Sequence, residues 1–285
     1  MNLPIEILSD IFKCLLYDFY DLSSLHSCVL VNRTWCQEAV RWLYKNPFGY
    51  YACDCDAQLL TLYISYLPKE TQKLFEFTHL EFDNPANLLF NYPAYIEHID
   101  DSLIFHKLDS FIQAYNGQAT IYQKAFDAIL RMLLTRASKL TYCRITTGIS
   151  TKCFSTFKEQ LHHVQILHLF LVSDTKSDRK SLEQLTDIIS SPKGLIEFEL
   201  ISHYPTLSNR ILYALESQCD SLRVLLLRSI IFSAFPLLDW ISKFHLLNEV
   251  YFDFCEDMGD DVITYLEKKS VSVSKADSQE MTNNI

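Results

Sequence analysis

The chain has 285 residues, of which 49% are hydrophobic and 21% are charged, and its formal net charge is −10 at pH 7. The apolar side chains can bury a substantial core, which argues against disorder over most of the chain and allows one large domain, or a small domain beside a medium one. The acidic balance argues against nucleic acid or an anionic membrane as the main partner, because both attract a surplus of lysine and arginine.

The expected location of the protein follows from its hydropathy and its cysteines. No run free of charged residues reaches the roughly 18 residues that a membrane-spanning helix needs, and the N-terminus lacks the basic segment of a targeting signal. The nine cysteines are odd in number and scattered, so we expect reduced thiols in a reducing compartment. The expected location is therefore the cytoplasm, the nucleus or both.

Three helices are predicted in the first part of the chain. Pro4 suits the first turn of one helix, and Asp21 is a candidate N-cap for a second. A third begins near Asn32 and ends before Pro47. The apolar residues of the first helix fall on one stripe: Ile7, Leu8, Ile11, Phe12, Leu15 and Leu16. A unit of roughly 45 residues is too small to bury a good core alone, so we expect a partner, the rest of the chain or both to cover its stripes.

These residues resemble the F-box family. The matching parts, in chain order, are Leu3-Pro4-Ile5-Glu6-Ile7-Leu8, Ile11-Phe12, Asp21-Leu22-Ser23-Ser24-Leu25 and Cys28-Val29-Leu30-Val31-Asn32-Arg33-Thr34-Trp35. The family pattern is a Leu-Pro-x-Glu start, an apolar helix, Asp-Leu, and a Val-x-Arg-x-Trp turn ahead of the last helix. The resemblance covers about a sixth of the chain, residues 1–48. It implies that this segment docks on the Skp adaptor of a cullin ubiquitin ligase complex.

The resemblance also implies an apolar interface on these helices. Its expected members are Leu3, Pro4, Ile7, Leu8, Ile11, Phe12, Leu25, Val31 and Trp35. The first six are expected to pack against the adaptor, and the other three to belong to the interface or support it. Burial of the apolar stripe in a groove would drive the docking. The alternative is a helical segment that packs on the rest of the chain without a partner.

An apolar motif recurs after a predicted helical linker at residues 49–76. Its copies are Phe77-x-x-Leu80-x-Phe82, Leu140-x-x-Cys143-x-Ile145, Val164-x-x-Leu167-x-Leu169, Leu195-x-x-Phe198-x-Leu200, Leu222-x-x-Leu225-x-Leu227 and Leu247-x-x-Val250-x-Phe252. The last five copies begin 24, 31, 27 and 25 residues apart. A short strand and a helix that repeat every ~20–29 residues resemble the leucine-rich repeat, whose units stack into a curved solenoid.

Helical patterns separate the copies of the motif. They fall at residues 125–134, 182–189, 211–215 and 237–241, and an acidic helix is expected at 257–268. Leucine-rich repeats often carry Asn or Cys three residues after the last apolar position, where the side chain bonds to the backbone, and only Cys255 fits that pattern. The segment 85–121 is either a degenerate repeat or an inserted loop. The polar tail at 270–285 is predicted to be disordered.

The predicted fold is thus α+β, with an N-terminal three-helix F-box domain followed by a short α/β leucine-rich-repeat solenoid at residues 77–269. In such a solenoid the central polar position of each strand faces the concave side. These positions form the candidate substrate surface: Glu81, Arg144, His168, Glu199 and Tyr251, with Leu226 at the same place in the fifth copy. The positions two residues earlier are His79, Tyr142, Ile166, Glu197, Val224 and Glu249. The alternative is a solvated sheet face without a ligand.

No catalytic or metal-binding motif stands out. The chain has five glycines and no glycine-rich phosphate loop. Cys53-Asp54-Cys55 lacks a second cysteine pair at zinc-site spacing, and the pair His162-His163 lies beside a predicted strand. We therefore expect no enzymatic activity, no cofactor and no metal.

These patterns predict a substrate-recognition adaptor of a Skp–cullin–F-box ubiquitin ligase, whose repeats bind a protein substrate. The alternative is a non-catalytic repeat scaffold whose F-box-like helices pack internally, and a hydrolase with a dispersed site is a third class. The substrate, its need for phosphorylation and the completeness of the repeat array stay open at this stage.

Overall fold

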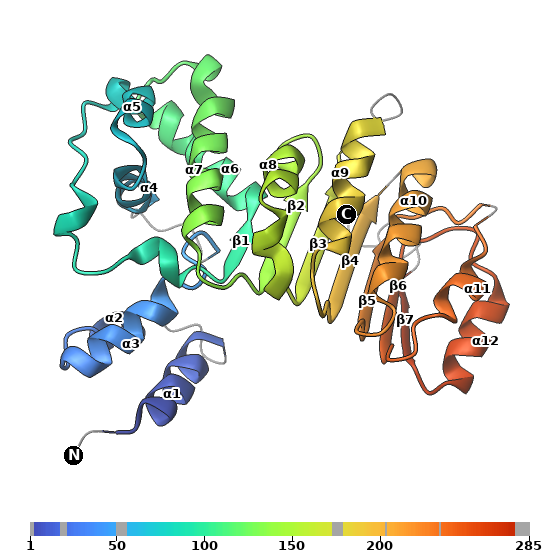
Figure 1. The fold of residues 1–285 in the computed structure, drawn as a ribbon. Helices are drawn as coiled ribbons and strands as arrows, with labels where there is room; N and C mark the ends of the chain where they lie inside the picture. The colour runs from blue at the N-terminus through green and yellow to red at the C-terminus, as the bar shows by residue number, and fades with distance from the viewer. Residues whose placement is uncertain are drawn as a thin grey trace, which may run out of the picture. The chain divides into compact units, whose positions relative to one another are not determined.

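The computed structural model describes residues 3–17, 22–49, 56–172, 179–202, 204–233 and 235–276 (Figure 1). Contacts divide the chain into two units. The first comprises Met1–Ile99 and Leu103–Lys139, and the second comprises Asp100–Ser102 and Leu140–Ile285. The first unit is mostly helical, whereas the second alternates strands with helices. Within the described ranges, no helix is both long enough and apolar enough to cross a membrane.

The first unit opens with the three predicted helices. They are α1 (Ile5–Tyr17), α2 (Leu22–Cys28) and α3 (Arg33–Leu43). Helix α3 begins where predicted because the extended residue Asn32 caps it, its side chain accepting a hydrogen bond from the backbone N of Trp35 at 3.0 Å. The expected N-cap Asp21 lies outside the described residues. The buried core of the three helices consists of Leu8, Phe12, Leu16, Leu25, Ala39 and Leu43.

Helices also make up the rest of the first unit. The α-helices are α4 (Asp56–Ser65), α5 (Lys69–Gln72), α6 (Asp101–Ala114), whose first two residues belong to the second unit, and α7 (Tyr122–Arg136). The 3-10 helices are η1 (Lys73–Thr78), η2 (Pro85–Asn87), η3 (Tyr92–Tyr95) and η4 (Ala119–Ile121). The helical linker is confirmed over α4 and α5, while residues 50–55 of that prediction lie outside the described part of the chain. Helix α7 confirms the helix predicted at 125–134.

The strand predicted at residues 77–82 is wrong. Its first residues belong to η1, which ends at His79 in the left-handed conformation (φ 55°). The apolar spacing has another cause here: the rings of Phe77, Phe82 and Phe111 lie 6.4–6.5 Å from the buried ring of Phe75. The aromatic residues thus form a local cluster among helices. Their spacing in the sequence is the same as that of the apolar residues of a repeat strand.

A sheet of seven strands runs in strict chain order. The strands are β1 (His98–Asp100), β2 (Tyr142–Thr146), β3 (Ile166–Leu171), β4 (Glu197–Ser202), β5 (Val224–Arg228), β6 (Glu249–Asp253) and β7 (Ser272–Ala276). Its strands from β2 to β7 lie in the second unit. Every pairing from β2 to β7 is parallel. The five strands predicted between residues 140 and 252 are confirmed, and the sheet is open because β1 and β7 are its two edges.

The two edge strands differ from the sequence predictions. Strand β1 and helix α6 lie in the segment 85–121, so this segment contributes to the sheet and is not simply an inserted loop. Strand β7 lies in the tail that was expected to be disordered, which is a correction for residues 272–276; residues 277–285 are outside the described part. Backbone pairing with β6 holds β7, as in the 2.8 Å hydrogen bond from Ser272 N to Asn248 O. Backbone pairing requires no particular side chains, so the amino-acid composition of residues 272–276 did not indicate a strand.

One α-helix follows each strand from β2 to β6. These helices are α8 (Thr151–Thr156), α9 (Arg179–Ser190), α10 (Pro205–Leu215), α11 (Leu237–Ile241) and α12 (Asp260–Lys268). The 3-10 helices η5 (Lys158–His163) and η6 (Glu216–Gln218) come after α8 and α10. Crossovers between parallel strands share one hand in nearly all proteins, so strands in chain order place all crossover helices on one face of the sheet. Figure 1 shows α8 to α12 along one side of the strands.

Burial along the strands follows from this arrangement. In β3, the side chains of Leu167, Leu169 and Leu171 are buried, whereas those of Ile166 and His168 are only half-buried. The strands β5 and β6 alternate in the same way. One face of the sheet is thus the core under the helices, and the other face is accessible to solvent.

A buried aspartate ties the end of β2 to the start of α6. The Asp101 side chain is fully buried and accepts hydrogen bonds from Thr146 N at 2.7 Å, from Thr146 Oγ1 at 2.9 Å and from the Ser150 hydroxyl. Burial raises the pKa of Asp101 to about 6, even though the hydrogen bonds from Ser150 and Thr146 oppose that shift.

The substitution Asp101→Asn is expected to remove a pH dependence of stability. Between pH 4 and pH 6 the unfolded chain loses the Asp101 proton while the folded chain keeps it, so stability that is present below pH 4 is lost as the pH rises through about 6. The free energy of unfolding of the wild type minus that of the variant should fall by about 3 kcal/mol over this range. Urea unfolding at several pH values measures the difference, and a value that stays constant with pH would contradict the assignment.

Candidate functional site

Helix α1 exposes an apolar stripe. The side chains of Ile7 and Ile11 are 47% and 38% exposed, and Leu3 just before the helix is 41% exposed. Pro4 is exposed as well. Positions 4, 7 and 11 recur every three or four residues and therefore share one side of the helix. An outward helix face is normally polar, so this stripe is a candidate contact surface.

The other side of α1 builds the core beneath this stripe. Leu8 and Phe12 are fully buried, as is Leu25 from α2, and the ring of Phe12 meets that of Trp35 edge to face with centroids 5.6 Å apart. The prediction that Leu8 and Phe12 themselves pack against a partner is thereby corrected. In the folded three-helix unit their surface is already covered, so they support the exposed stripe from below.

A second apolar surface lies in the turn between α2 and α3. Val31, a predicted site residue, is 57% exposed, and its neighbour Leu30 is 87% exposed. Leu30 was not predicted as a site residue, and neither was Ile5, which is 56% exposed. The run of apolar residues from Cys28 to Val31 is the signal for Leu30, because a short turn cannot bury four consecutive side chains.

Substitutions on the two sides of α1 should differ in how much they destabilise the three helices. Phe12→Ala removes a fully buried ring and is expected to destabilise the three helices by roughly 3–5 kcal/mol, whereas Ile11→Ala, at a partly exposed position, should cost well under that. Amide hydrogen exchange of peptides from residues 5–17 measures the loss of protection. Equal protection in the two variants would contradict the assigned faces of the helix.

The open face of the sheet carries the other candidate site. The parallel register aligns Arg144, His168, Glu199, Leu226 and Tyr251 in one row across β2 to β6. The sequence predicted this row, and its alignment is confirmed. Glu81 is not part of it, because it lies in an exposed segment without regular structure after η1, and His79 ends η1. The prediction that Glu81 belongs to the sheet face is therefore wrong.

His168 is the centre of a polar network on this face. Its Nε2 lies 3.0 Å from Glu197 Oε1, and its Nδ1 lies 3.1 Å from Glu199 Oε2 and 3.3 Å from the hydroxyl of Tyr142. Burial, and then the charge of Asp100, raise the pKa of Tyr142, so its phenol keeps its proton.

Arg228 extends the network toward β6. Its Nε lies 3.1 Å from Glu199 Oε1 and 3.1 Å from Asp253 Oδ2, although it makes no well-aligned hydrogen bond to either. Arg144 lies 3.7 Å from Asp100. The sequence prediction missed Arg228 because it considered the central strand positions, and this residue lies two positions after the centre of its strand.

The network leaves the sheet face acidic. Its carboxylates outnumber its two guanidinium groups, and the carboxylates are Asp100, Glu197, Glu199, Glu249 and Asp253. Tyr251 donates a hydrogen bond to Glu249 at 2.9 Å, and this bond raises the pKa of its phenol. The face thus offers a mixed polar surface that favours positively charged groups.

Among the described residues, no three side chains of His, Cys, Asp or Glu are grouped so that they could hold a metal ion. The Cys53-Asp54-Cys55 segment lies outside the described ranges.

Comparison with known proteins gives no relative: no family model matches the chain, and no curated protein matches it significantly. The function is therefore argued from the surfaces themselves, from the motif spacing and from the physical chemistry of the exposed residues.

Proposed function

We propose that the protein is a substrate receptor of a Skp–cullin–F-box ubiquitin ligase. The observation that carries this proposal is the exposed apolar stripe of α1, with Pro4, Ile7 and Ile11 lying over a closed three-helix core. Burying such a stripe against a partner gains about 25 cal/mol for each Å² of apolar surface removed from water. The stripe coincides with the segment that resembles an F-box, so the partner proposed is the Skp adaptor.

The separation of exposed from buried apolar residues within the segment supports docking. Leu3, Pro4, Ile7, Ile11 and Val31 are exposed, whereas Leu8, Phe12 and Leu25 are buried beneath them and Trp35 is half-buried. A contact surface that is already ordered before binding loses less conformational entropy when the complex forms. The segment therefore has the form of a preorganised docking module.

We further propose that the sheet and its helices form an irregular leucine-rich-repeat solenoid. The register supports this, because the motif positions form continuous buried rows. One row contains Cys143, Leu167, Phe198, Leu225 and Val250, and the next contains Ile145, Leu169, Leu200, Leu227 and Phe252. Each unit covers the apolar edge of its neighbour, as stacked repeats do.

Cys255 adds a second argument for repeats. It is the one residue that fits the Asn/Cys position of the family pattern. Its Sγ lies 3.2 Å from the carbonyl oxygen of Leu227 on the neighbouring strand, to which the thiol donates a hydrogen bond. Burial raises the pKa of Cys255 to about 11, so the thiol keeps the proton that this bond needs. The contact ties one turn to the preceding repeat.

In the proposed complex, catalysis comes from proximity. The three helices hold the adaptor, and the open sheet face holds a protein substrate near the ubiquitin-charged enzyme, which raises the effective concentration of the two reactants. The acidic character of the face favours a substrate segment rich in lysine or arginine. No residue of this chain needs to enter the chemical step.

The double substitution Ile7→Asp/Ile11→Asp is expected to abolish binding to the Skp adaptor. Two carboxylates would have to be desolvated in the interface, which costs several kcal/mol without counterions. The measurement is co-expression of the full chain with the adaptor, followed by size-exclusion chromatography. Leu89→Asp is the matched control, because Leu89 is an exposed leucine (89%) outside the stripe and its substitution should leave the complex intact.

The same experiment distinguishes the alternative scaffold. A stable one-to-one complex of the wild type, lost in the double variant, supports the ligase role. A wild-type chain that is folded and elutes apart from the adaptor would overturn it and favour a repeat scaffold without a ligase partner. Binding that survives in the double variant would show that the stripe is not the docking surface.

Charge reversal on the sheet face should weaken the binding of protein substrates. Glu197→Lys/Glu249→Lys reverses two carboxylates of one row across β4 and β6, so proteins held by basic segments should be repelled. The measurement is quantitative mass spectrometry of the ubiquitinated proteins that co-purify with the receptor complex. Asp220→Lys/Glu267→Lys, at exposed positions outside the strands, is the charge-matched control. An unchanged set of proteins in the first variant would count against this face.

A further inference from the structure

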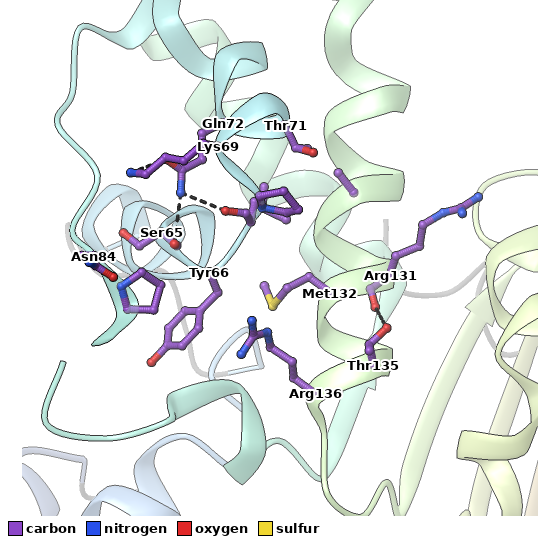
Figure 2. A pocket seen from close by; sticks show the side chains of 14 residues that line it. Ser65, Tyr66, Lys69, Thr71, Gln72, Asn84, Arg131, Met132, Thr135 and Arg136 are labelled. Carbon is purple, nitrogen blue, oxygen red and sulfur yellow. Dashed lines mark hydrogen bonds between the residues drawn. The ribbon is translucent and has the colours of Figure 1, made fainter. Parts of the chain in front are cut away.

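A groove of about 680 Å³ lies within the first unit (Figure 2). It is formed by α4, α5, the start of η2 and α7. The residues that line it include Tyr66, Lys69, Pro85, Met132 and Arg136. None of the surfaces described above includes this groove.

The charge of the groove is opposite to that of the chain. Lys69, Arg131 and Arg136 line it, and no carboxylate does so among the described residues, although the whole chain has a net charge of −10. Lys69 Nζ donates to the amide oxygen of Gln72 at 3.1 Å. In the described part of the chain, no carboxylate forms an ion pair with the guanidinium of Arg131 or Arg136. Lys69 and Arg136 are therefore available to an anionic ligand in the groove, whereas the side chain of Arg131 points away from it in Figure 2.

Arg136 is held in place by an aromatic ring of the groove. Its guanidinium lies over the ring of Tyr66, 5.4 Å from the centroid, and Figure 2 shows it pointing across the groove toward that ring. The ring itself is fixed, because the Tyr66 hydroxyl donates to Phe90 O at 2.8 Å and accepts from Tyr92 N at 3.3 Å. A guanidinium stacked on an aromatic face still presents its N–H edge to an anion.

The apolar residues that line the groove indicate which kind of ligand fits it. Leu67, Pro68, Pro85 and Met132 give apolar surface between the cations. The groove is open along one side, whereas small-molecule sites bury most of their ligand. An open groove with spaced cations and apolar walls fits an extended chain whose side chains alternate between acidic and apolar.

We propose that this groove binds an acidic peptide segment of a partner protein, with Arg136 as the anchor and Lys69 as a second contact. A carboxylate of the peptide accepts hydrogen bonds from the edge of the Arg136 guanidinium, and a neighbouring apolar side chain packs against Met132 and the prolines. This site goes beyond the proposed ligase role, and neither proposal rests on the other.

The test uses the purified full chain and a fluorescently labelled eight-residue peptide that alternates glutamate with leucine. Fluorescence anisotropy should show saturable binding, and Lys69→Ala/Arg136→Ala should weaken it at least about tenfold, because both charged donors to the peptide carboxylates are lost. Arg136→Lys should weaken it as well, since the ammonium keeps the charge and loses the planar stack on Tyr66.

Two controls make the outcome specific. Arg210→Ala/Arg223→Ala removes the same charge at exposed positions of the second unit and should bind the peptide like the wild type. The peptide with glutamine in place of glutamate should bind at least about tenfold more weakly to the wild type. Thermal unfolding should be unchanged in Arg136→Lys, which keeps the assay interpretable if the double alanine variant is less stable.

Several results would overturn the proposal. They are absence of binding by the wild type, equal binding by the Lys69/Arg136 variant, and equal binding of the glutamine peptide. Competition by inorganic phosphate alone at low concentration, or binding to phosphatidylserine vesicles in place of the peptide, would also overturn it, because the site would then recognise an isolated anion or a lipid headgroup. None of these results would depend on whether the chain binds the Skp adaptor.

Discussion

The order of the strands is the constraint on which the second unit depends. Because the strands from β2 to β7 are parallel neighbours in chain order, every connection between them returns to the same end of the sheet and crosses the same face. The helices that follow the strands then cover one face of the sheet. Apolar residues at alternate positions of β3, β5 and β6 are buried on that face, whereas the residues between them are half-buried, and Glu199 of β4 is buried as well.

A related limit applies to the three N-terminal helices. A unit of this size offers each helix only one side on which to bury apolar residues. In α1, Leu8 and Phe12 take that side, so Ile7 and Ile11 are left on the surface. The stability of the unit and its proposed docking thus use adjacent residues of one helix. Their distribution between core and surface follows from the packing of α1 against α3, in which the ring of Trp35 meets that of Phe12.

Opposite charges are separated between the two units. The open sheet face gathers carboxylates around His168 and Arg228, whereas the groove of the first unit gathers Lys69, Arg131 and Arg136 without a carboxylate. A chain with a net charge of −10 would ordinarily neutralise exposed cations with its own acidic side chains. The two surfaces therefore suit partners of different chemistry.

The sequence by itself determined the strands from β2 to β6, their mutual register and the helices between them. Side chains alternate with period two along a strand, so the spacing of apolar residues such as Leu167 and Leu169 marks both the strand and its buried face. It also determined the amphipathic start of α1. Where a local pattern had another cause, as in the aromatic cluster of Phe75, the same reasoning predicted a strand that is not there.

Only the tertiary structure decided which distant residues meet. Strand β7 is held by backbone pairing, which does not require a particular side-chain pattern. Arg228 joins Glu199 and Asp253 from three different strands, and the cationic groove combines residues of α5 and α7 that are about sixty positions apart. Such contacts depend on how whole elements pack. Local spacing reports the burial of one segment and carries no information about the segment that covers it.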